Sequence, residues 1–304
     1  MAKVVVTGKI PSGALTRLRA EHDVLAWEES TPISREELLK RVSGADAIVS
    51  LLTEKIDDEL LAAAGTQLKS VSNVAVGYNN IDVPACKARS VLVTNTPGVL
   101  TEATADIAMS LILMTTRRLA EGERVIRAQQ PWQWGMFYML GSSIQGRQLG
   151  IVGMGQIGAA VARRARAFGM TIAYTKRTPL DAATHKELDA KHVELDELLA
   201  TSDVVSLHCP YSPETHHFMN ATQLAKMKSS AYLINTARGP VVDEAALADA
   251  LQRNVIAGAG LDVFEKEPVV HEGLLGLDNA VLIPHLGSAT VETRAAMADL
   301  AATN

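Results

Sequence analysis

The sequence has few cysteines, no long apolar run and no excess of positive charge. Only two of its 304 residues are cysteines, Cys86 and Cys209, so no disulfide framework is expected and a reducing compartment is the simpler reading, although a pairing between the two stays open. The most apolar run, residues 107–114, is far shorter than the roughly 20 residues that a membrane span needs. The N-terminus has the pattern of a β-strand and not of a signal peptide. We therefore expect a cytoplasmic protein without a transmembrane helix.

The charge balance argues against polyanionic partners. The 29 basic and 34 acidic residues give a formal net charge of −5, so no global positive field is present to hold nucleic acid or an anionic membrane. With 47% hydrophobic and 21% charged residues, the chain can bury substantial cores and is not disordered. At about 150 residues per domain, two domains are expected.

Short β-branched runs alternate with helical patterns along the whole chain, which predicts an α/β fold with parallel sheets. The first series contains five strand candidates, at residues 4–7, 24–27, 47–52, 70–73 and 91–95. The second series contains six, at residues 149–152, 171–175, 204–207, 232–235, 257–261 and 281–283. Six strands in this arrangement make a complete dinucleotide-type sheet.

Local signals predict where helices and domains begin. Ser34 and Glu37 have the spacing that lets each side chain satisfy an exposed amide at a helix start. Thr96-Pro97-Gly98 breaks any regular element, and a long helical segment follows from about Thr101. The segment after His285 is too short for a domain, so we expect it to pack back on the first series. The predicted domains are residues 1–99 with 286–304, and residues 100–285.

A hydrophobic strand at 149–152 leads into the pattern G-x-G-x-x-G and then a helix over residues 157–168. Gly153 permits the tight turn, Gly155 lets the backbone approach a pyrophosphate, and Gly158 lets the helix pack on the strand. The helix start supplies amides to the anion. An ordinary tight turn between strand and helix is the alternative. The predicted cofactor-binding residues here are Gly153, Gly155, Gln156, Ile157 and Gly158.

The turn after the next strand favours a phosphorylated cofactor. A free ribose diol, as in NAD, calls for an acidic residue at the end of this strand, but the sequence continues Thr175-Lys176-Arg177-Thr178. Hydroxyls and cationic side chains suit a 2′-phosphate, so NADP(H) is the preferred cofactor and NAD(H) stays possible. A solvated basic turn is the alternative explanation.

Three charged or titratable residues follow predicted strands of the second series: Arg238, Glu267 and His285. Because the carboxyl ends of parallel strands open onto one crevice, these residues can converge. Histidine changes charge near neutral pH and suits proton transfer, and a neighbouring carboxylate such as Glu267 favours the imidazolium. Arg238 can hold a substrate carboxylate bidentately. Together they suit the reduction of a 2-keto acid.

Several motifs together resemble the D-isomer-specific 2-hydroxyacid dehydrogenases, especially the branch of glyoxylate and hydroxypyruvate reductases, over nearly the whole chain. The matching stretches are residues 74–82, 96–106, the glycine turn, 235–239, 260–265 and 284–287. The resemblance implies a flavodoxin-like substrate domain and a Rossmann NAD(P)-binding domain, with the active site in the cleft between them. It also implies a homodimer formed largely through the cofactor domains.

The resemblance assigns roles to residues at matching positions. Arg238 corresponds to the substrate-binding arginine, Glu267 to the orienting glutamate and His285 to the proton-transferring histidine. Val76 and Gly77 would offer backbone amides to the substrate carboxylate. The remaining cofactor contacts implied are Thr104 at a phosphate, Asp262 at the nicotinamide carboxamide, and Cys209, Pro210, Thr215, Thr236, Ala237 and Gly287 in the loops around the riboses and the nicotinamide.

Other features leave alternatives open. Trp132, Trp134 and Phe137 are candidates for a role in a partner's substrate pocket, with core or dimer packing as the equal alternative. The two histidine-containing pairs 208–209 and 216–217 lack the spacing of four ligands, so no metal is expected. The substrate could also be a larger 2-keto acid, such as 2-ketogluconate or an aromatic one. Formate or phosphite oxidation is less favoured, and a dinucleotide-sensing interaction module on the same fold is the alternative outside enzymes.

Overall fold

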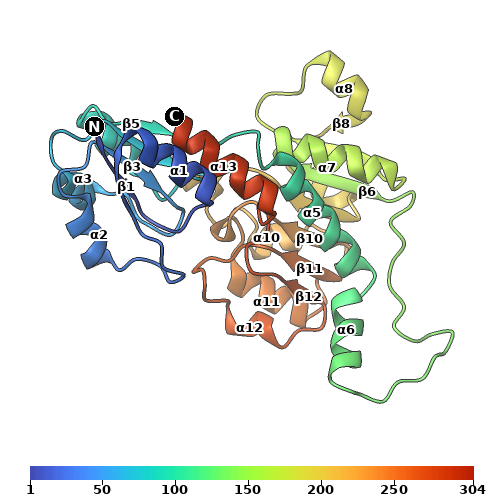
Figure 1. Cartoon of the computed structure of the whole chain (residues 1–304). Helices are drawn as coiled ribbons and strands as arrows, with labels where there is room; N and C mark the ends of the chain where they lie inside the picture. The colour runs from blue at the N-terminus through green and yellow to red at the C-terminus, as the bar shows by residue number, and fades with distance from the viewer. The chain divides into compact units, whose positions relative to one another are not determined.

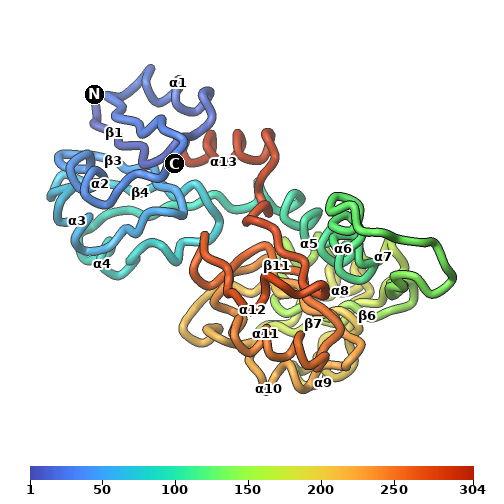
Figure 2. The backbone as a smooth tube through the Cα atoms, turned by 90° about the horizontal axis from the view of Figure 1, so that it is seen from below, coloured from blue at the N-terminus to red at the C-terminus, as the bar shows by residue number.

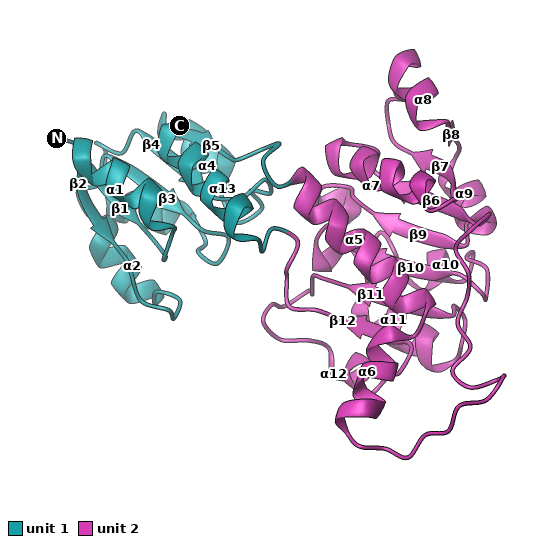
Figure 3. Cartoon of the chain, turned by 45° about the vertical axis from the view of Figure 1, so that its right-hand side comes forward, with its two compact units in different colours: residues 1–100, 288–304 teal, residues 101–287 magenta.

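The computed structural model describes residues 1–304, which form two compact units. Unit 1 comprises residues 1–100 and 288–304, and unit 2 comprises residues 101–287. Figure 3 shows the two units in different colours. Each unit contains a parallel sheet with helices, and each is described separately below.

Unit 1 is built on a five-stranded parallel sheet in the order β2-β1-β3-β4-β5. This is the order of flavodoxin-like doubly wound sheets, and all five predicted strands are present. Buried valines and isoleucines on both faces of the central strands explain why they read as apolar runs. The strands are β1 (Lys3–Val6), β2 (Asp23–Ala26), β3 (Ala47–Ser50), β4 (Ser70–Asn73) and β5 (Leu92–Thr94).

The helices that cover this sheet come from both ends of the unit's sequence. They are α1 (Ser12–Glu21), α2 (Arg35–Val42), α3 (Asp58–Ala64), α4 (Val83–Ala88) and α13 (Val291–Thr303). Helix α13 lies beside α1 in Figures 1 and 2. The guanidinium of Arg17 donates to the carbonyl of Asp299 at 2.7 Å and to the hydroxyl of Thr303 at 2.8 Å. The tail after residue 287 is therefore part of unit 1.

The predicted pairing at the start of α2 is only half formed. The hydroxyl of Ser34 accepts the amide of Glu37 at 3.3 Å. The carboxylate of Glu37 does not return to Ser34 but pairs with Arg41, one helical turn on, at 2.7 Å. The reciprocal bond was therefore a wrong expectation, because a cation at i+4 competes for the glutamate.

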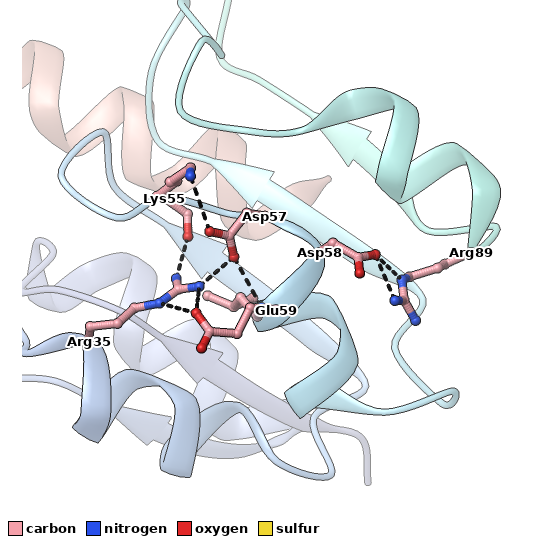
Figure 4. A network of polar contacts seen from close by, with 7 residues as sticks. Arg35, Lys55, Asp57, Asp58, Glu59 and Arg89 are labelled. Carbon is pink, nitrogen blue, oxygen red and sulfur yellow. Dashed lines mark hydrogen bonds and ion pairs between the residues drawn. The ribbon is translucent and has the colours of Figure 1, made fainter.

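Ion pairs tie the helices of unit 1 to one another (Figure 4). Arg35 of α2 contacts Glu59 of α3 at 2.7 Å and also pairs with Asp57, which caps α3. Burial acts to raise the pKa of Asp57, but its hydrogen bonds and the charge of Arg35 outweigh burial and lower the pKa overall. Arg89 reaches Asp58 at 2.7 Å.

Unit 2 is built on a seven-stranded parallel sheet in the order β12-β11-β10-β9-β6-β7-β8. The first six strands in chain order follow the Rossmann arrangement 3-2-1-4-5-6, and the seventh extends the sheet. Sequence patterns predicted six strands and missed β8, a short edge strand in which Lys191 and His192 give no β-branched signal. The strands are β6 (Gln148–Val152), β7 (Thr171–Thr175), β8 (Ala190–His192), β9 (Val204–Leu207), β10 (Tyr232–Asn235), β11 (Gly258–Leu261) and β12 (Ala280–Leu282).

Two apolar cores lie in unit 2, and β6 and β9 contribute residues to both. Helices α5 and α7 pack against each other, as Figure 1 shows, with α7 over β6 and β7 and α5 over β10 and β11. The helices are α5 (Thr101–Thr116), α6 (Leu119–Arg127), α7 (Gln156–Ala167), α8 (Ala182–Leu188), α9 (Leu195–Thr201), α10 (Ala221–Leu224), α11 (Glu244–Gln252) and α12 (Glu272–Leu275), with 3-10 turns η1 (Pro213–Thr215) and η2 (Gly239–Val241). None of the helices in either unit has the length and apolarity that crossing a bilayer requires.

Candidate active site

The glycine turn after β6 has the close packing that its pattern predicts. Gly153 has φ of +93°, and a Cβ there would lie 2.6 Å from the backbone nitrogen of Cys209. A Cβ on Gly158 would lie 2.7 Å from the carbonyl oxygen of Gly153. Gly155, the residue before α7, has no atom within 4 Å of the corresponding position. Two glycines are therefore needed for packing, and the third leaves the backbone open to approach.

The start of α7 fits a dinucleotide pyrophosphate. The helix runs from Gln156 to Ala167, and no side chain caps its N-terminus. The first amides of a helix lack intrahelical acceptors and carry partial positive charge, so they favour an anion. The bare glycine at the cap and the free helix start are the two features that a bound pyrophosphate needs.

The basic turn after β7 presents cationic side chains at the carboxyl edge of the sheet. Lys176 is half-buried, whereas Arg177 and Thr178 are exposed. The ring Nε2 of His192, at the end of β8, lies 3.3 Å from the carbonyl oxygen of Lys176. The pKa of the exposed Glu214 is lowered, first by its bond with Ser212 and further by the charge of Arg177. Arg177 therefore faces one acidic group but is not locked in an ion pair.

Arg238 follows β10 in a loop that Asn235 holds in shape. The side chain of Asn235 donates to the carbonyl of Arg238 at 3.0 Å and accepts the amide of Ala237 at 3.0 Å. A Cβ on Gly239 would lie 1.9 Å from the carbonyl group of Phe264, so only glycine fits there. Burial lowers the pKa of Arg238, and the charge of Glu267 partly offsets this.

Glu267 and His285 are in hydrogen-bond contact within unit 2. Carboxylate Oε2 of Glu267 lies 2.7 Å from Nδ1 of His285, and the side chains are 35% and 33% exposed. Oε1 accepts the amide of Phe264 at 3.0 Å. Burial acts to raise the pKa of Glu267, but His285, this amide and Arg238 together lower it. The carboxylate is thus held ionised beside the imidazole, whose Nε2 is left to act on a ligand.

Asp262 anchors the backbone around His285. It is buried, and its two oxygens accept the amides of Leu286 at 2.5 Å and Gly287 at 2.8 Å. Burial raises its pKa, against the influence of these amides and of His285. The hydroxyl of Thr104 donates to the carbonyl of Gly287 at 3.2 Å. Asp262, Thr104 and Gly287 are therefore brought together, and His285 adopts φ of +51° next to them.

The loop after β9 lies against the glycine turn. The backbone amide of His208 donates to the carbonyl oxygen of Val152 at 2.8 Å. The ring of His208 contacts the hydroxyls of Ser206 at 2.9 Å and of Thr236 at 3.5 Å. Burial lowers the pKa of His208 to about 4 and raises that of Cys209 to about 11, so both side chains are neutral near pH 7. The two cysteines of the chain are free thiols. Thr215 closes the loop by donating to the carbonyl of Pro210 at 2.9 Å.

Val76 and Gly77 lie in unit 1, in the loop after β4. Their carbonyl oxygens accept bonds from Asn95 and Asn73, each at 2.8 Å. These bonds fix the loop through its carbonyls. The proposed use of its amides stays a prediction.

The sequence did not predict the residues that support the loops carrying Arg238 and Glu267. Asn235 and Gly239 stand in a quoted motif, but their support of the Arg238 loop was not foreseen. Glu244 and Glu265, which join the start of α11 to the Glu267 loop, were also missed. Burial of a charged residue such as Glu244 is a tertiary property, and the sequence around it signals only a helix start.

The Rossmann unit, its glycine turn and the Glu267–His285 pair beside Arg238 define a dinucleotide-dependent dehydrogenase. Residues 109–287 match the family described as D-isomer specific 2-hydroxyacid dehydrogenase, NAD binding domain. The chain belongs to this family, in the branch of the glyoxylate reductases.

Comparisons over the full length agree. A glyoxylate reductase of Thermococcus onnurineus is 49% identical over 99% of this chain and 91% of its own length. The TT0316 protein of Thermus thermophilus superposes with a TM-score of 0.92 at 43% identity, over 99% of this chain and 95% of that one. An NADPH-dependent glyoxylate/hydroxypyruvate reductase of Sinorhizobium meliloti, solved with NADP and malonate, has a TM-score of 0.86 at 38% identity, over 100% of this chain and 92% of that one.

Proposed function

We propose that this chain reduces small 2-keto acids, glyoxylate to glycolate and hydroxypyruvate to D-glycerate, with NADPH as the preferred reductant. The observation that carries the proposal is the 2.7 Å contact between Glu267 and His285 in the unit that also holds the glycine turn. The Sinorhizobium meliloti enzyme, named for both substrates and for NADPH, supports the same chemistry.

His285, Glu267 and Arg238 each have one role in this reaction. The nicotinamide, when bound, supplies the hydride to the keto carbon. The imidazolium of His285 gives its Nε2 proton to the carbonyl oxygen as the alkoxide develops, so C=O becomes CH–OH. Glu267 holds the ring through Nδ1 and stabilises its positive charge. Arg238 binds the substrate carboxylate and fixes which face of the keto carbon reacts.

The preference for NADPH rests on the turn after β7. Thr175, Lys176, Arg177 and Thr178 include no carboxylate that would repel a 2′-phosphate, and an exposed guanidinium such as that of Arg177 suits one. The remaining assigned contacts belong to the same proposal: Thr104, Cys209, Pro210, Thr215, Thr236, Ala237, Asp262 and Gly287 around the cofactor, and the Val76 and Gly77 amides at the substrate carboxylate.

We also propose that unit 2 forms a homodimer. Helix α6 buries none of its residues, and the segment between α6 and β6 runs out from the body of unit 2 in Figure 3. Large apolar side chains at residues 132–138 of this segment are exposed, including Trp134 at 75% and Phe137 at 88%. An apolar surface of this kind is typical of a protein interface. Light scattering after gel filtration should give about twice the 32.5 kDa of one chain, and a monomer would refute the proposal.

Initial rates test the function directly. Glyoxylate, hydroxypyruvate, pyruvate and 2-ketogluconate would each be assayed with NADPH and with NADH by loss of nicotinamide absorbance. We expect the highest kcat/KM for glyoxylate and hydroxypyruvate with NADPH. A higher kcat/KM for 2-ketogluconate would show that the substrate is a larger 2-keto acid. Cofactor binding without any turnover would favour the alternative of a dinucleotide-sensing interaction module. A preference for NADH would refute the role of Arg177 in binding the 2′-phosphate and leave the proposed reaction standing.

A further inference from the structure

One buried carboxylate fastens the loop that carries Glu267. Glu244, the first residue of α11, is 5% exposed. Its Oε1 accepts the amide of Glu265 at 2.6 Å, and its Oε2 accepts the amide of His271 at 3.3 Å. These two amides stand before and after Glu267 in the chain. A single side chain therefore holds both ends of the loop.

The contact is reciprocal. Oε1 of Glu265 accepts the amide of Glu244 at 2.9 Å, and Nε2 of His217 lies 3.2 Å from the same oxygen. The other ring nitrogen of His217 lies 3.9 Å from Asp243. Burial raises the pKa of Glu244, and the charge of Glu265 acts in the same direction, while the amides of Glu265 and His271 oppose them. The carboxylate of each residue thus accepts the backbone amide of the other.

We call the contacts among Glu244, Glu265 and the amide of His271 the clasp. The clasp is also connected to the loop that carries Arg238. Helix α11 follows η2, whose first residue is Gly239, directly after Arg238. Gly239 packs against the carbonyl of Phe264, and the amide of Phe264 donates to Glu267. One chain segment therefore supports the loops of both Arg238 and Glu267.

We propose that Glu244 and Glu265 are positioning residues that keep Glu267 in hydrogen-bond contact with His285. The proposal rests on the proposed acid-base chemistry of that pair. Without the clasp, the loop loses its fixed bonds to α11, and Glu267 is free to move away from the ring. The imidazole then loses the partner that determines which nitrogen carries the proton.

The first test measures which ring nitrogen of His285 carries the proton, and it does not require enzymatic turnover. Long-range ¹H–¹⁵N spectra of ¹⁵N-histidine protein at alkaline pH distinguish the two neutral forms of an imidazole. The His285 signal, assigned by its loss in His285→Gln, should show the proton on Nδ1 in the wild type. Glu265→Ala and Glu244→Ala should shift it toward the Nε2-protonated form. Glu265→Gln keeps an acceptor oxygen for the Glu244 amide and should retain the wild-type form.

The second test is kinetic. In both alanine variants, kcat for glyoxylate should fall about tenfold or more, because small misplacements in an active site are costly. Binding of NADPH, measured by fluorescence, should not change. Asp249→Ala is the matched control, since Asp249 is an exposed carboxylate of α11 that contacts only Arg253.

The outcomes separate the two proposals. Wild-type protein without turnover would refute the proposed function, and the ring spectra would still decide the positioning role. An unchanged Nδ1 proton in Glu265→Ala would refute positioning even if activity fell. So would a loss in Glu265→Gln equal to that in Glu265→Ala. If Glu244→Ala does not fold, the pair of Glu265 variants gives the answer alone.

Discussion

Removing the guanidinium of Arg177 should change the choice of cofactor without changing the chemistry. Arg177 is exposed in the turn after β7, and none of the ion pairs in the structure includes it. It contributes little to the folded state, so Arg177→Ala should fold normally. The loss is then confined to whatever ligand the turn binds.

The magnitude follows from the exposure of the side chain. A hydrogen bond between charged groups contributes about 1.5–3 kcal/mol. Because Arg177 is solvated, we take the lower part of that range, about 1.5–2 kcal/mol, which corresponds to roughly a 10- to 30-fold higher KM for NADPH. The KM for NADH, which has no 2′-phosphate, should stay nearly the same. The value of kcat should be unchanged with both cofactors.

Salt gives an independent check on this reasoning. Exposed charge pairs are screened at high ionic strength, where the Debye length falls to a few ångströms at about 1 M. The KM for NADPH should therefore rise with salt in the wild type and much less in Arg177→Ala. Arg163→Ala is the matched control, since Arg163 is also exposed in unit 2 but pairs with Glu187 at 2.6 Å. Equal losses for NADPH and NADH in Arg177→Ala would refute the assignment.

Four further variants test the rest of the site. His285→Ala should lower kcat about 100-fold or more by removing the proton donor, and near-normal rates from folded protein would refute that role. Because folding lowers the pKa of Glu267, its ionised carboxylate stabilises the folded protein at pH values above the pKa of the unfolded chain. This stabilisation is lost as the pH falls through the lower pKa of the folded protein. The free energies of unfolding in urea of Glu267→Gln and wild type should therefore differ at pH 7 and converge in acid. Gly153→Ala should cost about 1–3 kcal/mol in backbone strain, seen by chemical denaturation, and should abolish cofactor binding. Glu214→Gln should lower the KM for NADPH by removing the acidic group that faces Arg177, and a higher KM would contradict this.

Much of the fold could be predicted because its signals are local. The central strands β1, β6, β9 and β10 are rich in buried valine, isoleucine and leucine, and the breaks at Thr96-Pro97-Gly98 and at the glycine turn need no tertiary information. Strand β8 was missed because its pairing with β7, and not its composition, makes it a strand. The failed bond between Glu37 and Ser34 has a similar cause, since Arg41 competes for the same carboxylate.

The contact between Glu267 and His285 was predictable from their positions after strands. Arg238, Glu267 and His285 each follow a strand, and the parallel sheet leads such residues to one edge. The parts that place them were not predictable. Asn235 supports a loop through its own backbone neighbours, and Glu244 is buried by contacts with residues far along the chain. Such roles depend on which loops become neighbours, which no local pattern records.

The return of the chain to unit 1 has a consequence for synthesis on the ribosome. Unit 2 is one continuous stretch, residues 101–287, and all its strands have been translated before α13 emerges. Unit 1 contains its five strands from the beginning but lacks α13 until residues 291–303 appear. Ala298 and Ala301 of this helix lie in the same buried core as Val4 and Val6 of β1. Unit 1 is therefore translated first but completed last. Its sheet gains α13 only after all of unit 2 has been translated.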